Sequence, residues 1–132
     1  MTTQTSEGMA MKLGILPLGR PTFDVPFAEE NLTAMLAALD ASGQEVVGPR
    51  ELLFDEVATK AGIEALKAAD VDQVLILQVT FTDASMTVAI GAAFDQPLSI
   101  WSIPEPRLGD RLRLNSFCGL NLASHALGLN NR

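Results

Sequence analysis

Near the middle of the chain stands the hydrophobic run Val74-Leu75-Ile76-Leu77-Gln78-Val79. Its β-branched and leucine side chains do not alternate with polar residues, as they would in a strand with one solvent-exposed face. Such a continuous apolar run is typical of a central parallel strand covered on both faces. A second such run, Lys12-Leu13-Gly14-Ile15-Leu16-Pro17-Leu18, is stopped by Gly19-Arg20-Pro21. These two runs predict an open parallel sheet with helices on both of its faces.

Two more strands are expected at Glu45–Val47 and Leu98–Ile103, and helix signals separate all of them. Each helix signal is a polar capping residue followed by apolar side chains at helical spacing. The expected helices run from a cap at Asp24 to Gly43, from a cap at Asp55 to about Ala69, from Ala84 to Phe94 after a cap at Thr82 or Asp83, and from Phe117 to Leu127 after a cap at Asn115 or Ser116.

The apolar faces of three of these helices can be read from the spacing. They are Leu32, Met35, Leu36 and Leu39 in the first helix, Val57, Ala61, Ala65 and Ala69 in the second, and Phe117, Leu120, Ala123 and Leu127 in the last.

The alternation of strands and helices requires right-handed crossovers. We therefore predict an α/β fold, a three-layer, open, doubly wound parallel sheet of four strands, for which we choose the flavodoxin-like order 2-1-3-4. Residues 1–11 are polar, small and without periodicity, so they are expected to be a disordered tail. Residues 12–132 form a single domain, since a chain of 132 residues can bury one core.

Charge and composition exclude several classes of partner. The net charge is −7 and the pI is about 4.5, which disfavours nucleic acid and anionic membranes. The basic residues Arg107, Arg111 and Arg113 form either a solvated loop or a contact for an anionic group or a neighbouring subunit. One cysteine, no secretory leader pattern and no long apolar run predict a cytoplasmic protein.

In such a sheet, ligands bind in the loops beyond the carboxyl ends of the strands. Those loops lack the G-x-G-x-x-G and phosphate-cradle patterns of dinucleotide, flavin and P-loop proteins, so no such cofactor is expected. No metal site and no catalytic residue are predicted either. The single histidine, His125, lies within a helix, and Glu105 and Asp110 are expected to pair with the nearby arginines.

Three single residues have both an ordinary and a functional interpretation. Cys118 is expected to be a buried or inert thiol, with a nucleophile near a helix start as the alternative. Arg20 follows a buried strand and precedes proline, so either it contacts a ligand or it forms a surface salt bridge. Trp101 is expected to pack in the core, ahead of sugar stacking or a subunit contact.

Three segments, Lys12–Asp24, Val74–Asp83 and Arg113–Leu122, together resemble the N-terminal domain of L-fucose/L-arabinose isomerase-like proteins. Members of that family carry further domains and interconvert aldoses and ketoses on a Mn²⁺ ion. The resemblance implies that the Mn²⁺ ligands and acid/base carboxylates lie in domains absent from this chain, which would be inactive alone. It also implies a homo-oligomer in which the first domain closes over a neighbouring subunit's site.

The resemblance further implies a set of substrate-binding residues for a monosaccharide-like small molecule. Arg20-Pro21 matches a pair that contacts substrate, and the loop after the third strand contributes Phe81 and Thr82, without the tryptophan of some relatives. Ser116 and Cys118 in the last matched segment complete the set.

The preferred hypothesis is thus the substrate-side and oligomerisation domain of an aldose–ketose isomerase of carbohydrate metabolism. A freestanding flavodoxin-like module that binds a small molecule or a regulatory partner is the alternative, and the natural reading frame beyond Arg132 distinguishes the two. A small enzyme with Cys118 as nucleophile is a third hypothesis, which requires a base within hydrogen-bond reach.

Overall fold

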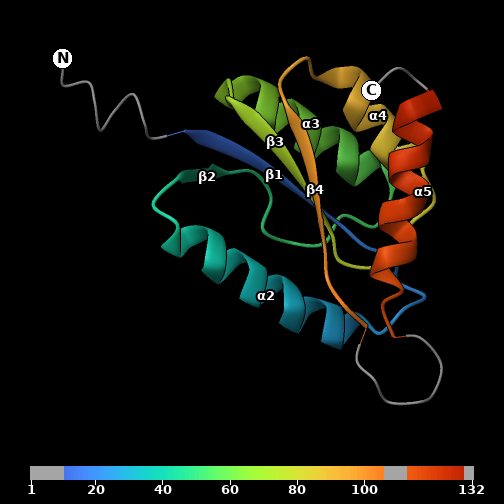
Figure 1. Ribbon diagram of the computed structural model, residues 1–132. Coiled ribbons are helices and arrows are strands. Elements are labelled where there is room, and N and C mark those ends of the chain that lie inside the picture. The colour runs from blue at the N-terminus through green and yellow to red at the C-terminus, as the bar shows by residue number, and fades with distance from the viewer. Residues whose placement is uncertain (1–10, 106–112, 130–132) are drawn as a thin grey trace, which may run out of the picture.

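The computed structural model describes residues 11–105 and 113–129 (Figure 1). The elements follow one another as β1 (Lys12–Leu18), α2 (Val25–Ala41), β2 (Glu45–Val47), α3 (Glu56–Ala69), β3 (Gln73–Gln78), α4 (Ser85–Ala93), β4 (Leu98–Ser102) and α5 (Ser116–Leu129). The expected alternation of strands and helices is confirmed. The predicted tail lies, apart from Met11, outside the described residues.

The sheet has four strands in the order β2-β1-β3-β4, and every neighbouring pair is parallel. The predicted fold class is therefore confirmed, including the strand order. Because all four strands run the same way, their carboxyl ends lie at one edge of the sheet. The loops that follow the central strands β1 and β3 are neighbours there, since Leu18 is paired with Gln78.

Two apolar clusters cover the two faces of the sheet. One lies between the sheet and α3 and α4 and includes Leu16, Ile76, Leu66 and Ile90; the other lies under α2 and includes Ile15, Leu77, Leu32 and Met35. Figure 1 shows α2 on one side of the sheet, α3 and α4 on the other, and α5 beside β4. Trp101 is half-buried against the α2 cluster, as its core interpretation predicted.

The caps expected for the first two helices are confirmed. An Asp24 carboxylate oxygen accepts from the amide of Phe27, and one from Asp55 accepts from the amide of Ala58. The cap predicted for α4 is wrong, because Ala84 stands at the N-cap and makes no side-chain bond. Asp83, one residue earlier, accepts from the amide of Ser85 instead.

The predicted apolar faces are right for α2 and wrong for α3. Val57 is 80% exposed, whereas Thr59, Gly62, Ile63 and Leu66 are the buried residues of α3. Ile63 and Leu66 bury more apolar surface than an alanine stripe can, so they set the rotation of the helix. In α5, Ala123 and Leu127 are buried as expected, but Phe117 is 52% exposed.

Candidate functional site

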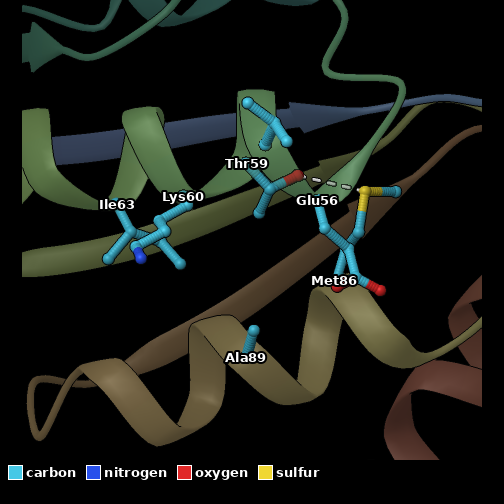
Figure 2. Close-up of a pocket in the computed structure, with 7 residues that line it drawn as sticks. Glu56, Thr59, Lys60, Ile63, Met86 and Ala89 are labelled. Carbon is cyan, nitrogen blue, oxygen red and sulfur yellow. Dashed lines mark hydrogen bonds between the residues drawn. The ribbon is translucent and has the colours of Figure 1, made fainter.

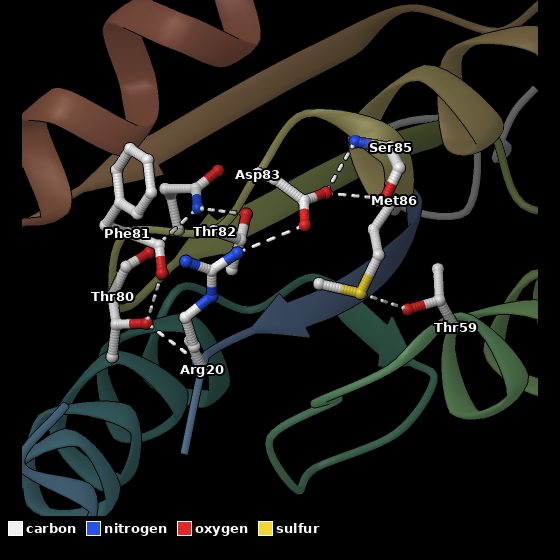
Figure 3. Close-up of polar contacts among 9 residues, drawn as sticks. Arg20, Thr59, Thr80, Phe81, Thr82, Asp83, Ser85 and Met86 are labelled. Atoms are coloured by element: carbon white, nitrogen blue, oxygen red, sulfur yellow. Dashed lines mark hydrogen bonds and ion pairs between the residues drawn. The ribbon is translucent and has the colours of Figure 1, made fainter. Parts of the chain in front are cut away.

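The loops after β1 and β3 are joined by one buried hydroxyl group. Thr80 Oγ1 accepts from the backbone amide of Arg20 at 2.9 Å and donates to the carbonyl oxygen of Phe81 at 2.9 Å (Figure 3). Thr80 is 1% exposed, so the bond is shielded from water. The start of the Arg20 loop is thereby fixed against the β3 loop.

The Arg20 guanidinium group has a defined direction but remains open to solvent. Its Nη2 lies 3.1 Å from Asp83 Oδ2, and its Cζ lies 5.5 Å from the centre of the Phe81 ring. The Arg20 side chain keeps 36% of its surface exposed, so donors remain for another partner. The surface salt bridge of Arg20 is therefore present, and contact of Arg20 with a ligand stays a prediction.

Asp83 is held as a carboxylate. The Ser85 hydroxyl, the Ser85 amide and the Arg20 guanidinium lower the pKa of Asp83, against a smaller effect of burial that raises it. A group with a lowered pKa stays ionised at neutral pH and is a poor proton donor there. The role of Asp83 in this arrangement is to orient Arg20.

The Gln78 side chain forms hydrogen bonds that hold the loop after β3. The side chain is fully buried, and its Nε2 donates to the Thr80 carbonyl oxygen at 2.8 Å and to Thr82 Oγ1 at 3.1 Å. A β-carbon on Gly119 of α5 would lie 3.0 Å from that Nε2, so glycine permits the close approach. From sequence Gln78 was assigned only to a strand, although a lone amide at the end of an apolar run is a sign of a buried polar role.

A hollow of about 400 Å³ opens beyond the carboxyl ends of β1 and β3. The loops line it with Arg20, Pro21, Thr82 and Asp83, and the segment before α3 adds Phe54. This volume is in the range of small-molecule pockets. Of the six predicted substrate-binding residues, Arg20, Pro21 and Thr82 therefore meet in one hollow.

The other three predicted residues, Phe81, Ser116 and Cys118, do not line this hollow. Phe81 packs under the Arg20 guanidinium and against Phe23, with ring centres 6.3 Å apart. Ser116 is 1% exposed, and its hydroxyl accepts from the Ile103 amide at 3.0 Å and donates to the Gln78 carbonyl oxygen. The main chain therefore takes the hydroxyl proton of Ser116 and one of its acceptor sites, and burial shields the rest from a ligand.

Cys118 is exposed, so the expectation of a buried thiol is wrong. It follows Phe117 on the first turn of α5, where the small residue Gly119 takes the inner position. His125 is seven residues further along the same helix. That separation is about 10 Å along the axis, beyond hydrogen-bond reach.

Glu105 anchors the start of α5, a role that the sequence analysis missed. Its carboxylate accepts from the amides of Arg113, Leu114 and Asn115. Burial raises the pKa of Glu105, but the three amide bonds outweigh it, so the pKa is lowered overall. The expected pairing of Glu105 with arginine side chains is thus replaced by backbone bonds, and Arg107, Asp110 and Arg111 lie outside the described residues.

Arg113 connects the segment before α5, which Glu105 holds, to the loop after β1. Its Nε lies 2.8 Å from Asp24 Oδ2, and its guanidinium lies over the Phe27 ring at 3.8 Å. The Arg113 hydrogen bond, helped by the Phe27 amide, lowers the pKa of Asp24. Arg113, Pro21 and Asp24 also line a second hollow of about 540 Å³.

A further, more apolar groove of about 340 Å³ lies between α3 and α4. Figure 2 shows Ile63, Lys60 and Glu56 on one side and Met86 and Ala89 on the other, with the Thr59 hydroxyl directed at the Met86 sulfur 3.0 Å away. Met86 also lines the 400 Å³ hollow, so the two depressions are neighbours.

Within residues 11–105 and 113–129, no group of three or more His, Cys, Asp and Glu side chains is placed to hold a metal ion. In the same part of the chain, no helix has the length and apolar character needed to cross a membrane.

The chain is similar to curated sulfoquinovose isomerases. It is 35% identical over 112 residues to those of Priestia aryabhattai and Priestia megaterium, a match that covers 85% of this chain and 25% of each relative. The sulfoquinovose isomerase of Clostridium sp. (strain MSTE9) is 30% identical over 118 residues, covering 88% of this chain and 26% of the relative. The chain thus spans about a quarter of the length of these relatives.

No solved structure matches the chain significantly. The family described as "Fucose/sulfoquinovose isomerase, N-terminal domain" matches residues 14–132, which include both loops of the 400 Å³ hollow. The chain therefore belongs to the fucose/sulfoquinovose isomerase family, of which it is an N-terminal domain.

Proposed function

We propose that this chain forms the substrate-side wall of the active site of an aldose–ketose isomerase, in which Arg20 contacts the sugar. The observation that supports this role is the Arg20 guanidinium itself, held by Asp83 and Phe81 at the mouth of a 400 Å³ hollow while a third of its surface stays free. A guanidinium in a fixed direction donates several hydrogen bonds to sugar oxygens or to an anionic substituent.

The proton-transfer groups of the isomerisation are proposed to lie on other polypeptide. Three carboxylates line the hollow, Asp55, Glu56 and Asp83, and Asp24 follows in the loop after β1. Asp83 and Asp24 have lowered pKa values and are engaged with Arg20 and Arg113, and Asp55 caps α3. A general base works best with a pKa near the operating pH. The isolated chain is therefore predicted to be inactive.

The Mn²⁺ ion that the family resemblance implies is proposed to bind outside this chain. The described residues do not bring together a set of metal ligands, so none of them is assigned to the ion. The proposal also includes assembly as a homo-oligomer, in which this wall faces the reactive groups of a neighbouring subunit. The cytoplasm is the proposed location, which the lone free thiol of Cys118 supports.

Titration of the ¹⁵N-labelled chain with sulfoquinovose, L-fucose and glucose tests the role of Arg20. We expect amide shifts confined to residues 19–22 and 80–83, with sulfoquinovose or L-fucose binding more tightly than glucose. Arg20→Ala should weaken that binding about tenfold, as for the loss of one charged hydrogen bond. Arg50→Ala is the matched control, because Arg50 also pairs with an aspartate, Asp40, away from the hollow.

Shifts that map elsewhere, or equal binding by Arg20→Ala and the parent chain, would contradict the proposal. Saturating sugar that leaves all amides of both loops unchanged would do so as well.

A further inference from the structure

β4 forms one edge of the sheet, and no described residue pairs with its outer side. The Val74 amide donates to the Pro97 carbonyl oxygen at 3.0 Å, which fixes the register of β4 on β3. In a parallel ladder, alternate residues of a strand face the same neighbour. The amides of Ser99 and Trp101 therefore face β3, and the amides and carbonyls of Leu98, Ile100 and Ser102 face outward.

The two edges of the sheet differ in how they discourage pairing. The edge strand β2 is three residues long and carries the exposed residue Glu45. β4 is five residues long, Leu98-Ser99-Ile100-Trp101-Ser102, and contains neither a charge nor a proline. Natural edge strands are usually short, charged or interrupted because unpaired backbone groups attract another strand. β2 follows this rule and β4 does not.

The position of α5 is that of a crossover helix. It packs against α4 and β4, on the face of the sheet that α3 and α4 cover. Both of those helices lead into a parallel strand of the sheet. α5 follows β4 in the same way and returns along it, since Leu127 and Gly128 lie beside Leu98, the first residue of β4. The end of α5 is thus next to the place where a further parallel strand would begin.

An apolar groove accompanies the open edge. It has a volume of about 450 Å³ and lies between β4 and α5, lined by Leu98, Ile100, Leu120 and Leu127. On the other face of the sheet, Trp101 is only half-buried. A strand beside β4 would place alternate side chains in this groove and against Trp101, as period-two side chains require.

We propose that β4 pairs with a fifth parallel strand, supplied by polypeptide that lies outside the matched quarter in the relatives, and that α5 is the right-handed crossover helix leading to it. The relatives are about four times as long as their matched part, so they have ample chain to supply that strand. The crossover rule places this strand beside β4 with α5 over the shared face. The inference rests on the sheet edge and not on sugar binding by Arg20.

Amide hydrogen exchange measured by NMR tests the pairing. The probe is a hybrid in which this chain is followed by the roughly 40 residues after the matched region of the Priestia megaterium relative, a length that holds one βα unit. We expect the amides of Leu98, Ile100 and Ser102 to exchange at least tenfold more slowly in the hybrid than in the 132-residue chain. Those of Ser99 and Trp101 should be protected in both.

A folded hybrid in which the three outward amides exchange as fast as before would overturn the proposal. A 132-residue chain that sediments as a dimer with these amides already protected would place a second copy on the edge, and would overturn it too.

Two serine variants separate edge pairing from general stability. Ser102→Pro removes an outward amide and should leave the 132-residue chain folded while lowering the protection of Ile100 in the hybrid at least threefold. Ser99→Pro removes an amide that faces β3 and should destabilise the chain with or without the added residues. Unchanged Ile100 protection in the Ser102→Pro hybrid would count against strand addition.

Discussion

Ser116→Ala would remove the hydroxyl group that bridges β3 and β4 at their carboxyl ends. The register pairs Gln78 with Ser102, so the amide of Ile103 is the next one due to bond the Gln78 carbonyl oxygen. Ser116 takes that place, because its Oγ accepts from the Ile103 amide at 3.0 Å and donates to the Gln78 carbonyl. Alanine would leave both backbone groups without this partner.

The size of the stability loss expected for Ser116→Ala follows from the burial of the groups involved. Ser116 and Gln78 are 1% and 0% exposed, so water reaches the broken bonds poorly. An unsatisfied buried donor or acceptor costs about 1 to 3 kcal/mol. Two such groups, partly relieved by local adjustment of the strand ends, give an expected loss of about 2 to 4 kcal/mol in the free energy of unfolding. This loss is large beside a total domain stability of about 5 to 15 kcal/mol.

Urea unfolding followed by circular dichroism measures the loss, and amide exchange at Ile103 localises it. Ser124→Ala is the matched control, since Ser124 is an exposed serine on the same helix and its change should stay within about 0.5 kcal/mol. Equal stabilities of the two variants, or a Ser116→Ala loss below about 1 kcal/mol, would refute the bridging role.

Four other substitutions have defined expectations. Glu105→Gln should cost about 1.5 to 3 kcal/mol at pH 7, as it weakens the carboxylate bonds to the amides of residues 113–115. Because folding lowers the pKa of Glu105, the difference in urea unfolding between this variant and the parent should persist above the ordinary pKa of 4.5 and vanish as pH falls through the lowered value. Gly48→Ala should cost about 3 kcal/mol or more in the same assay, since φ is +122° and a β-carbon would lie 2.5 Å from a β1 carbonyl oxygen; Gly43→Ala, with open space around it, should cost about 1 kcal/mol. Asp55→Ala should lower stability by about 1 kcal/mol in thermal melts through loss of its N-cap bond.

The sheet could be predicted from sequence because its central strands are covered on both faces. The runs Lys12–Leu18 and Val74–Val79 are apolar at nearly every position, with Lys12 and Gln78 as the polar exceptions, and that pattern is visible without structure. Right-handed crossovers allow more than one doubly wound order, and the flavodoxin-like order 2-1-3-4 chosen among them is the one in the structure. The caps Asp24 and Asp55 were equally visible, since a cap is a local contact.

The spacing of apolar residues alone could not show which face of α3 packs against the sheet. Its sequence contains an alanine stripe and a second stripe with Ile63 and Leu66, and both have helical periodicity. The choice depends on the side chains of the sheet that α3 covers. A β-carbon on Gly14 would lie 2.8 Å from a Leu66 methyl group, so the smallest residue of β1 leaves space for Leu66. Such a match between two elements is long-range information.

The same limit applies to the site. Topology brought Arg20, Pro21 and Thr82 together, because loops at the carboxyl ends of adjacent parallel strands are neighbours by construction. The anchoring by Glu105 and the bridge by Ser116 depend instead on side chains that reach backbone groups ten or more residues away in most cases. No local pattern of residue types marks those contacts.

The buried contacts of Ser116 and Gln78 connect α5 to the proposed substrate loop, although no residue of α5 lines the 400 Å³ hollow. Ser116 donates to the Gln78 carbonyl, and the Gln78 amide holds the Thr80 carbonyl. The Thr80 hydroxyl in turn accepts from the Arg20 amide. The two bonds made by Gln78 are buried and the Arg20–Thr80 bond is part-buried, so a shift at the start of α5 is expected to displace the Arg20 loop. We therefore infer that Ser116 serves the site by positioning its loops, and that the family resemblance across residues 113–122 reflects this support rather than contact with the sugar.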